Sequence, residues 1–165
     1  MRLAIDANTL VAWAATDDKQ FRVARLNHLF ENRATVLIVP TPALAEFLVG
    51  ADSAGQAWLA MVEKKRAFQV AGFDRRSASE CADLDKIALA GKDKKQGSKA
   101  AWQKVKVDRQ ILAIARVNRA DLLITEDSDL LKLASACKMP ISKIEDLELP
   151  DSARQHNLEL DHPEE

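Results

Sequence analysis

The sequence predicts an α/β fold with a mainly parallel sheet, and two observations lead to this prediction. Short apolar runs rich in β-branched residues alternate along the chain with longer segments of helical periodicity. One such run, TVLIV at residues 35–39, is apolar throughout, which is typical of a strand buried on both faces of a parallel sheet. Because strands that alternate with helices join through right-handed crossovers, we expect one sheet of four to five strands flanked by helices.

The first half of the chain contains three of the expected strands. From the apolar periodicity we expect strands at 2–5, 35–39 and 67–73, and helices at 9–15, 20–32, 41–50 and 53–65. The segment TPALAEFLVG has the form of a helix start, with Thr41 as the N-cap and Pro42 at the first helical position. Gly50 then marks the break before the next helix.

The second half continues the alternation. We expect helices at 75–90, 101–118 and 128–136, and strands at 121–125 and 141–144, the last at an edge of the sheet. The polar stretch GKDKKQGSK, with two glycines, is expected to be a loop. From Pro150 the chain is expected to be poorly ordered, so residues 1–149 form one domain and residues 150–165 an acidic tail.

Composition points to an ordinary globular protein. Hydrophobic residues make up 47% of the chain and charged residues 30%. No apolar run approaches the roughly 20 residues that cross a bilayer, and Asp6 interrupts any signal-peptide core. Cys81 and Cys137 have neither metal-ligand spacing nor a disulfide framework, so we expect free, buried thiols. These features lead us to expect a cytoplasmic protein without a membrane partner.

Charge is unevenly distributed, although the formal net charge is only −1. Residues 91–109 carry six Lys and one Arg against two Asp, a local net charge of +5. Residues 143–165 carry eight acids against Lys143 and Arg154, a local net charge of −6. We expect a basic surface patch and an acidic tail, although a lysine-rich stretch is most often just a solvated loop.

Four carboxylates lie in segments that should be buried. Asp6 is the only charge in LAIDANTLVAWAAT, and Glu46 is the only charge in TPALAEFLVGA. Asp108 falls on the apolar stripe of its helix, and Asp127 follows an apolar strand within LLITEDSDL. Asp6 and Asp127 also close the first and fourth strands, at the sheet edge where parallel α/β folds bind ligands.

Three of these acids also have a structural explanation. Asp6 could accept backbone N–H bonds at the start of the next helix, and Asp127 could cap the helix that follows it. Glu46 could pair with Arg109, the one obvious basic residue near these segments. Four such acids together are harder to neutralise in this way, because carboxylates that cluster repel one another unless a cation or protonation offsets their charge.

The donor types favour a hard divalent cation. Oxygen ligands without His or Cys suit Mg²⁺ or Mn²⁺. The three histidines (His28, His156 and His162) lie outside the acidic segments, which argues against zinc. No Ser or Cys nucleophile has a plausible His neighbour, and no glycine-rich phosphate loop is present in the sequence.

The ordered series IDANTL, PALAEF and DRQILAIARVNRADLLITEDSDL resembles the PIN domain family of metal-dependent ribonucleases, which includes VapC-type toxins of toxin–antitoxin pairs. The resemblance runs from about Arg2 to Ile144 and is most specific in the last block. It implies a three-layer fold and an acidic quartet at Asp6, Glu46, Asp108 and Asp127. Asp129 matches an additional metal-binding acid found in many members. Asn8 and Thr125 match polar positions expected to orient the carboxylates or a water, although a helix cap and a strand-end β-former are equally ordinary readings of them.

The resemblance also implies hydrolysis of phosphodiester bonds with one or two Mg²⁺ or Mn²⁺ ions, leaving a 5′-phosphate and a 3′-hydroxyl. We expect Asp6 and Asp108 to be the primary ligands, with Glu46 and Asp127 completing the site. RNA is the expected substrate, but the same ions cleave DNA, so both stay open. An antitoxin protein and a second copy of the chain are the expected protein partners.

Six lysines are expected to contact nucleic-acid phosphates: Lys92, Lys94, Lys95, Lys99, Lys104 and Lys106. Trp102, among them, either stacks on an unpaired base or packs beneath its own helix. Two other functions compete with a nuclease. One is a catalytically idle interaction or nucleic-acid-binding protein of the same fold. The other is a phosphotransfer enzyme with Asp6 as nucleophile, but DAN lacks the second acid of an Asp-x-Asp signature.

Overall fold

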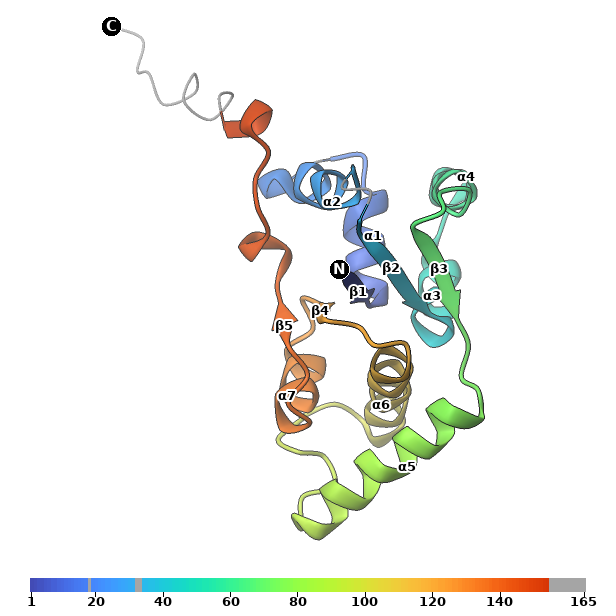
Figure 1. Cartoon of the computed structure of the whole chain (residues 1–165), viewed down its shortest axis with the longest axis vertical. Helices are drawn as coiled ribbons and strands as arrows, with labels where there is room; N and C mark the ends of the chain where they lie inside the picture. The colour runs from blue at the N-terminus through green and yellow to red at the C-terminus, as the bar shows by residue number, and fades with distance from the viewer. Residues whose placement is uncertain (18, 32–33, 155–165) are drawn as a thin grey trace, which may run out of the picture.

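A five-stranded parallel sheet forms the centre of the molecule (Figure 1). The computed structural model describes residues 1–17, 19–31 and 34–154. The strand order is β3-β2-β1-β4-β5, and every neighbouring pair is parallel. The strands are β1 (Arg2–Ile5), β2 (Val36–Pro40), β3 (Phe68–Ala71), β4 (Leu122–Ile124) and β5 (Ile141–Ser142). The predicted α/β class and parallel sheet are confirmed.

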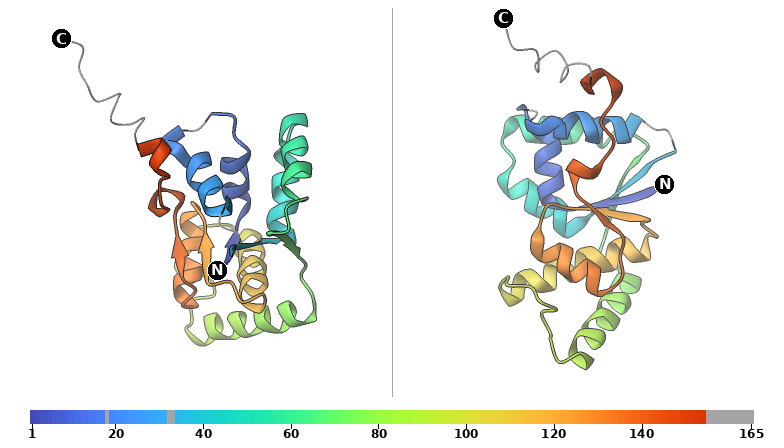
Figure 2. Two further views of the ribbon diagram at one scale, coloured as in Figure 1. Left: turned by 45° about the horizontal axis from the view of Figure 1, so that its top comes forward. Right: turned by 90° about the vertical axis from the view of Figure 1, so that its left-hand side faces the viewer.

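Helices cover both faces of the sheet, so the fold has three layers (Figure 2). On one face lie α1 (Ala7–Ala14), α2 (Arg22–Glu31) and α4 (Ser53–Val62). On the other lie α6 (Trp102–Val117) and α7 (Ser128–Ala136), with α5 (Arg75–Ala90) packed against α6. Between the layers, α3 (Thr41–Gly50) leaves the end of β2 and contacts both α1 and α6. Short 3₁₀ turns occur at Lys19–Phe21 and Ile144–Asp146.

The strands divide their side chains between two hydrophobic cores. In β1, Leu3 and Ile5 pack toward α1, α2 and α4, whereas Ala4 packs toward α6 and α7. The same alternation separates Leu123 from Ile124 in β4, as expected from the two-residue period of a strand. Burial of each such aliphatic side chain contributes about 1.5–3 kcal/mol, so both helix layers are firmly attached to the central strands.

Several element ends differ slightly from the sequence-based expectation. The structure has Pro40, not Thr41, in the N-cap position of α3, without a side-chain cap hydrogen bond. The reason is that β2 runs directly into the helix and leaves no intervening residue. The predicted edge strand is shorter than 141–144, because Ile144 begins a 3₁₀ turn and is fully buried.

Other expectations concern the C-terminal segment, the cysteines and the membrane. In the acidic segment 150–165, residues 151–154 form a helical turn, while residues 155–165 lie outside the described residues. The disorder expected there therefore stays a prediction. Cys81 and Cys137 are free and half-buried. In the part of the chain that the structure describes, no helix combines the length and apolar character needed to cross a membrane.

Candidate active site

The four predicted acids lie around one pocket at the carboxyl edge of the sheet. Asp6, Glu46, Asp108 and Asp127 line one small pocket, together with Asn8, Lys104 and three apolar residues. Asp6 follows β1 and Asp127 follows β4, which is the neighbouring strand. Glu46 comes from α3 and Asp108 from the second turn of α6. Four segments distant in sequence therefore contribute one carboxylate each.

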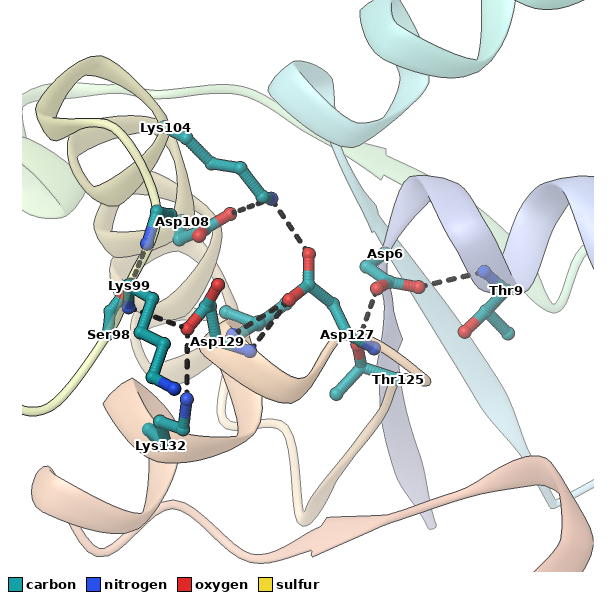
Figure 3. A network of polar contacts seen from close by, with 12 residues as sticks. Asp6, Thr9, Ser98, Lys99, Lys104, Asp108, Thr125, Asp127, Asp129 and Lys132 are labelled. Carbon is teal, nitrogen blue, oxygen red and sulfur yellow. Dashed lines mark hydrogen bonds and ion pairs between the residues drawn. The ribbon is translucent and has the colours of Figure 1, made fainter.

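Asp6 is held by hydrogen bonds to both of its carboxylate oxygens (Figure 3). Oδ1 accepts the Thr9 N–H at 2.8 Å, so Asp6 is the N-cap of α1, and Oδ2 accepts the Thr125 hydroxyl. Burial leaves the residue 4% exposed and raises its pKa, although the hydrogen bonds from Thr125 and Thr9 partly oppose that rise. A carboxylate this well buried at a helix start is costly unless something further offsets its charge.

Asp127 also combines a cap with a place in the pocket. Its Oδ1 accepts the N–H groups of Asp129 at 2.8 Å and of Leu130 at 3.2 Å, at the start of α7. Its own N–H donates to the Thr125 hydroxyl at 3.0 Å, so Thr125 contacts two of the four acids. Burial opposes ionisation of Asp127, but the hydrogen bonds from Lys104 and the two N–H groups outweigh it and lower its pKa.

Asp108 is the most enclosed of the four acids, at 2% exposure. Oδ1 accepts a hydrogen bond from Lys104 Nζ at 3.1 Å, and among the described residues Oδ2 has no hydrogen-bond donor. Burial raises the pKa of Asp108 to about 6 despite the nearby Lys104 ammonium, and the charges of Asp127 and Glu46 add to the rise. Asp108 thus carries an unsatisfied buried oxygen at a site with three other acids.

Glu46 differs from the other three because its side chain is exposed. It lines the pocket from α3, and within the described part of the chain it makes no hydrogen bond or ion pair. The pocket is therefore closed at Asp6 and Asp108 and open toward solvent at Glu46.

Lys104 is the pocket residue whose acidic partners the sequence did not lead us to expect. It is exposed, as expected of the basic stretch, but its Nζ also lies 3.1 Å from Asp108 Oδ1 and 2.8 Å from Asp127 Oδ2. These contacts outweigh the effect of burial and raise the pKa of Lys104, so it stays cationic. The signal available in the sequence was its spacing of four residues from Asp108 on one helix, which brings both side chains to the same face.

The suggested pairing of Glu46 with Arg109 is wrong. Arg109 forms an ion pair with Asp85 of α5 and donates to the Lys94 carbonyl and, at 3.2 Å, to Gln96 Oε1. The helical period explains the difference, since Arg109 follows Asp108 by one residue and points to another side of α6.

Two further predicted positions lie at or beside the pocket. Asn8 is exposed and lines it from the first turn of α1. Asp129 lies outside the lining and accepts the Lys99 N–H at 2.9 Å and Lys132 Nζ at 3.1 Å. These bonds lower the pKa of Asp129. The bond to the Lys99 N–H also connects the loop before α6 to the start of α7 (Figure 3). Its predicted metal-binding role and the orienting roles of Asn8 and Thr125 stay predictions.

The six lysines do not share one environment. Lys95 Nζ donates to the Ala100 carbonyl at 2.8 Å, and Lys94 and Lys106 lie 5.1 and 5.6 Å from the centre of the Trp102 ring. Within the described residues, the exposed side chains of Lys92 and Lys99 make no hydrogen bond or ion pair. Trp102 itself packs partly buried against the core beneath α6, and this favours packing over base stacking.

In the observed side-chain conformations, the acids of the pocket are not arranged to coordinate a metal ion. Among residues 1–17, 19–31 and 34–154, no three Asp, Glu, His or Cys side chains converge as an ion would require. The Lys104 ammonium contacts Asp108 and Asp127 where a cation would be needed. The donor set still fits a hard ion, since it consists of carboxylate oxygens and includes the unsatisfied Asp108 Oδ2.

Solved structures with the same arrangement of elements identify the fold. A chain of VapBC2 from Rickettsia felis, solved bound to a DNA fragment from its promoter, aligns with a TM-score of 0.60 and 14% identity, covering 87% of this chain and 98% of that one. The chain has a VapC-like PIN fold. DNA-bound VapBC from Salmonella typhimurium gives a TM-score of 0.57 and 18% identity over 87% and 98% of the two chains.

A third PIN-fold structure is a toxin with a stated target. VapC20 from Mycobacterium tuberculosis, described as a Sarcin-Ricin loop cleaving toxin, aligns with a TM-score of 0.55 and 16% identity over 88% of this chain and 99% of that one. No protein-family model matches the sequence, and no curated protein does either. The PIN fold thus rests on the three-dimensional arrangement, which confirms the predicted three-layer architecture.

Proposed function

We propose that this chain is a metal-dependent nuclease that hydrolyses phosphodiester bonds in single-stranded RNA. One observation carries the proposal: four carboxylates from four separate segments line a single pocket at the carboxyl edge of the sheet. Two of them, Asp6 and Asp108, are almost fully buried, and Asp108 keeps an unsatisfied oxygen. Burial of acids without full compensation is costly, which is why such groups concentrate at functional sites.

Mg²⁺ or Mn²⁺ is the cofactor that this donor set suits, as one or two ions. Asp6 and Asp108 are proposed as the main ligands, with Glu46 and Asp127 completing the coordination and Asp129 near the site. When bound, such an ion neutralises phosphate charge and lowers the pKa of water.

The other groups of the chain have supporting roles in this proposal. Thr125 donates to Asp6 and accepts from the Asp127 N–H, so one hydroxyl sets the orientation of two carboxylates. The helix caps fix Asp6 and Asp127 further, because each gives one oxygen to backbone N–H groups. Glu46 is exposed and makes no hydrogen bond or ion pair among the described residues, so its carboxylate is available to complete the coordination at the mouth of the pocket.

RNA is the proposed substrate, and the exposed lysines of the loop before α6 are proposed to hold its backbone. The exposed ammonium groups of Lys92 and Lys99, unpaired among the described residues, are available for phosphate contacts, which would give binding with little base selectivity. The RNA target named for VapC20 favours RNA over DNA. A protein partner of the antitoxin kind is proposed as well, since two of the structural neighbours are VapBC complexes.

The test uses Glu46→Gln, because Glu46 is exposed and makes no hydrogen bond or ion pair with another described residue. Purified protein is incubated with end-labelled single-stranded RNA or DNA of matched sequence, with Mg²⁺, Mn²⁺ or EDTA. We expect wild-type protein to cut RNA only with a divalent ion and Glu46→Gln to be slower by about 100-fold or more. Glu63→Gln changes another exposed acid, after α4 and outside the pocket lining; it is the matched control and should cut at the wild-type rate.

The result has clear alternatives. Cleavage of DNA in preference to RNA would overturn the substrate class but keep the nuclease. Cleavage in EDTA, or products ending in a 2′,3′-cyclic phosphate, would overturn the metal-dependent hydrolysis. Absence of cleavage by folded wild-type protein under every condition would favour the idle interaction protein instead.

A further inference from the structure

We propose that Lys104 is an internal cation of the acidic pocket, which a divalent ion must displace before the pocket can load. Lys104 would then set the ion concentration at which the site becomes competent. This inference rests on the proposed function, because it assigns one more residue to the same site. It concerns a lysine of this chain and needs no second protein.

The contacts of Lys104 define the position that it occupies. Its Nζ lies 2.8 Å from Asp127 Oδ2 and 3.1 Å from Asp108 Oδ1, so a single ammonium bridges two acids from different elements (Figure 3). Both carboxylates line the pocket with Asp6 and Glu46. The ammonium thus stands between two of the four acids, where a cation is needed to reduce their mutual repulsion.

A single ammonium leaves the pocket incompletely neutralised. Four carboxylates line it, and Lys104 is its only cationic lining residue among the described residues. Asp108 Oδ2 is buried and receives no hydrogen bond from any described residue. A doubly charged ion would offset more of the charge and use this oxygen, because hard cations bind several carboxylate oxygens at once. The divalent ion is therefore the better occupant once its concentration is sufficient.

The exposure of Lys104 also allows its ammonium group to leave the pocket. Its side chain is 42% exposed, whereas that of Asp108 is 3% exposed, so the ammonium can return to water while the acid cannot. The chain is long and flexible, and a compact ammonium is strongly hydrated. Lys104 precedes Asp108 by four residues on the same helix, so its side chain remains near the pocket and can return when the ion departs.

The experiment measures Mn²⁺ binding by calorimetry at pH 8, without any nucleic acid. Four proteins are compared: wild type, Lys104→Met, Lys104→Arg and Lys106→Met. Lys106 is the matched control, because it lies on the same helix but faces Trp102, so its loss changes the charge equally without emptying the pocket. Lys104→Gln replaces Lys104→Met if near-ultraviolet circular dichroism shows that the latter does not fold.

We expect Lys104→Met to bind Mn²⁺ about tenfold more tightly than wild type, since no ammonium competes for Asp108 and Asp127. Mn²⁺ should also raise the Tm of Lys104→Met more than that of wild type. Lys104→Arg keeps a competing cation and should bind Mn²⁺ as weakly as wild type, and Lys106→Met should also match wild type.

The opposite outcomes separate this inference from the proposed function. Equal Mn²⁺ affinity in all four proteins, or weaker binding by Lys104→Met, would overturn the exchange role and leave the metal-dependent nuclease standing. Absence of Mn²⁺ binding by every folded protein would overturn both.

Discussion

Asp108 and Arg109 are neighbours on α6, equally buried at 2% exposure and opposite in charge, but their surroundings differ. Both terminal nitrogens of Arg109 are engaged, by Asp85, the Lys94 carbonyl and Gln96, and only its Nε lacks an acceptor among the described residues. Asp108 receives one hydrogen bond from a half-exposed lysine and has a whole oxygen unsatisfied. The nearly satisfied charge of Arg109 connects α6 to α5 and to the loop before α6, whereas the carboxylate of Asp108 lines the acidic pocket.

The largest expected effect separates these two residues by activity. Asp108→Asn keeps the size of the side chain but removes the charge, so we expect cleavage of single-stranded RNA to fall by about 1,000-fold with the fold intact. At temperatures below its Tm, Arg109→Lys should cleave RNA at a rate within about threefold of wild type, because Arg109 does not line the pocket. Initial rates with Mg²⁺ and circular dichroism of both variants measure the difference. Similar losses of rate in both would break the comparison.

For the free energy of unfolding we expect the opposite order, with a larger loss on substitution of Arg109 than on substitution of Asp108. Arg109→Met leaves Asp85 without its cation and frees the Lys94 carbonyl and Gln96, so we expect the free energy of unfolding to fall by roughly 2–4 kcal/mol. Asp108→Asn should leave it unchanged or raise it, because the substitution removes a buried carboxylate whose ionised form is unfavourable at neutral pH. Urea titrations at neutral pH in EDTA provide the values.

The control for stability is Lys86→Met, which breaks an ion pair between two exposed residues of α5. It should change the free energy of unfolding by no more than about 1 kcal/mol. A smaller loss for Arg109→Met than for Lys86→Met would contradict the structural role of Arg109.

A smaller effect is expected in the pH dependence of stability. The Asp108 carboxyl, with an ordinary pKa of 3.8, titrates at about 6 in the folded protein because of burial. Between these values the folded state binds the extra proton, so the unfolding free energy contributed by this group rises as the pH falls through 6 toward 4. The stability of wild type relative to Asp108→Asn should therefore increase from pH 8 to pH 5 in EDTA. Denaturant titrations at each pH measure it, and a constant or reversed difference would refute the assignment.

The smallest effect concerns the basic loop before α6. Lys92→Ala with Lys99→Ala should lower the slope of log affinity against log salt by about 1.4 for single-stranded RNA, or about 0.7 for each lost phosphate contact. Lys94→Ala with Lys95→Ala should lower the slope by less, because Lys95 is bonded to the Ala100 carbonyl and Lys94 lies over Trp102. Fluorescence anisotropy with EDTA-treated protein measures both pairs, and identical slopes in every protein would remove the loop from RNA binding.

Periodicity predicted most of the fold because each element repeats its own pattern. The helices at Arg75–Ala90 and Ser128–Ala136 have the predicted bounds, and the parallel sheet brought Asp6 and Asp127 to one edge as expected. Charged residues in apolar segments then identified the other acids of the pocket. These signals depend on residues close together in the sequence, so a single sequence was sufficient to predict them.

The pairings of side chains could not be predicted in the same way. Arg109 meets Asp85 across two helices, and Asp129 meets a backbone N–H thirty residues away, so neither contact leaves a local pattern. The loop before α6 also contains left-handed residues, Lys92 and Gln96, besides Gly97. Its path therefore depends on its contacts with Arg109 and Asp129, and the lysines it carries could not be placed from spacing alone.

The Thr125 hydroxyl donates a hydrogen bond to Asp6, which lies 119 residues earlier in the sequence. This bond joins a segment that is synthesised early to one that is synthesised late. Thr9 makes a similar connection from α1 to the Ile124 carbonyl. During synthesis, Asp6 leaves the ribosome long before α6 and β4 exist to complete its surroundings. An emerging chain therefore holds only isolated acids, and a protein that cuts RNA in the proposed way would acquire that ability only after the message encoding its core has been read.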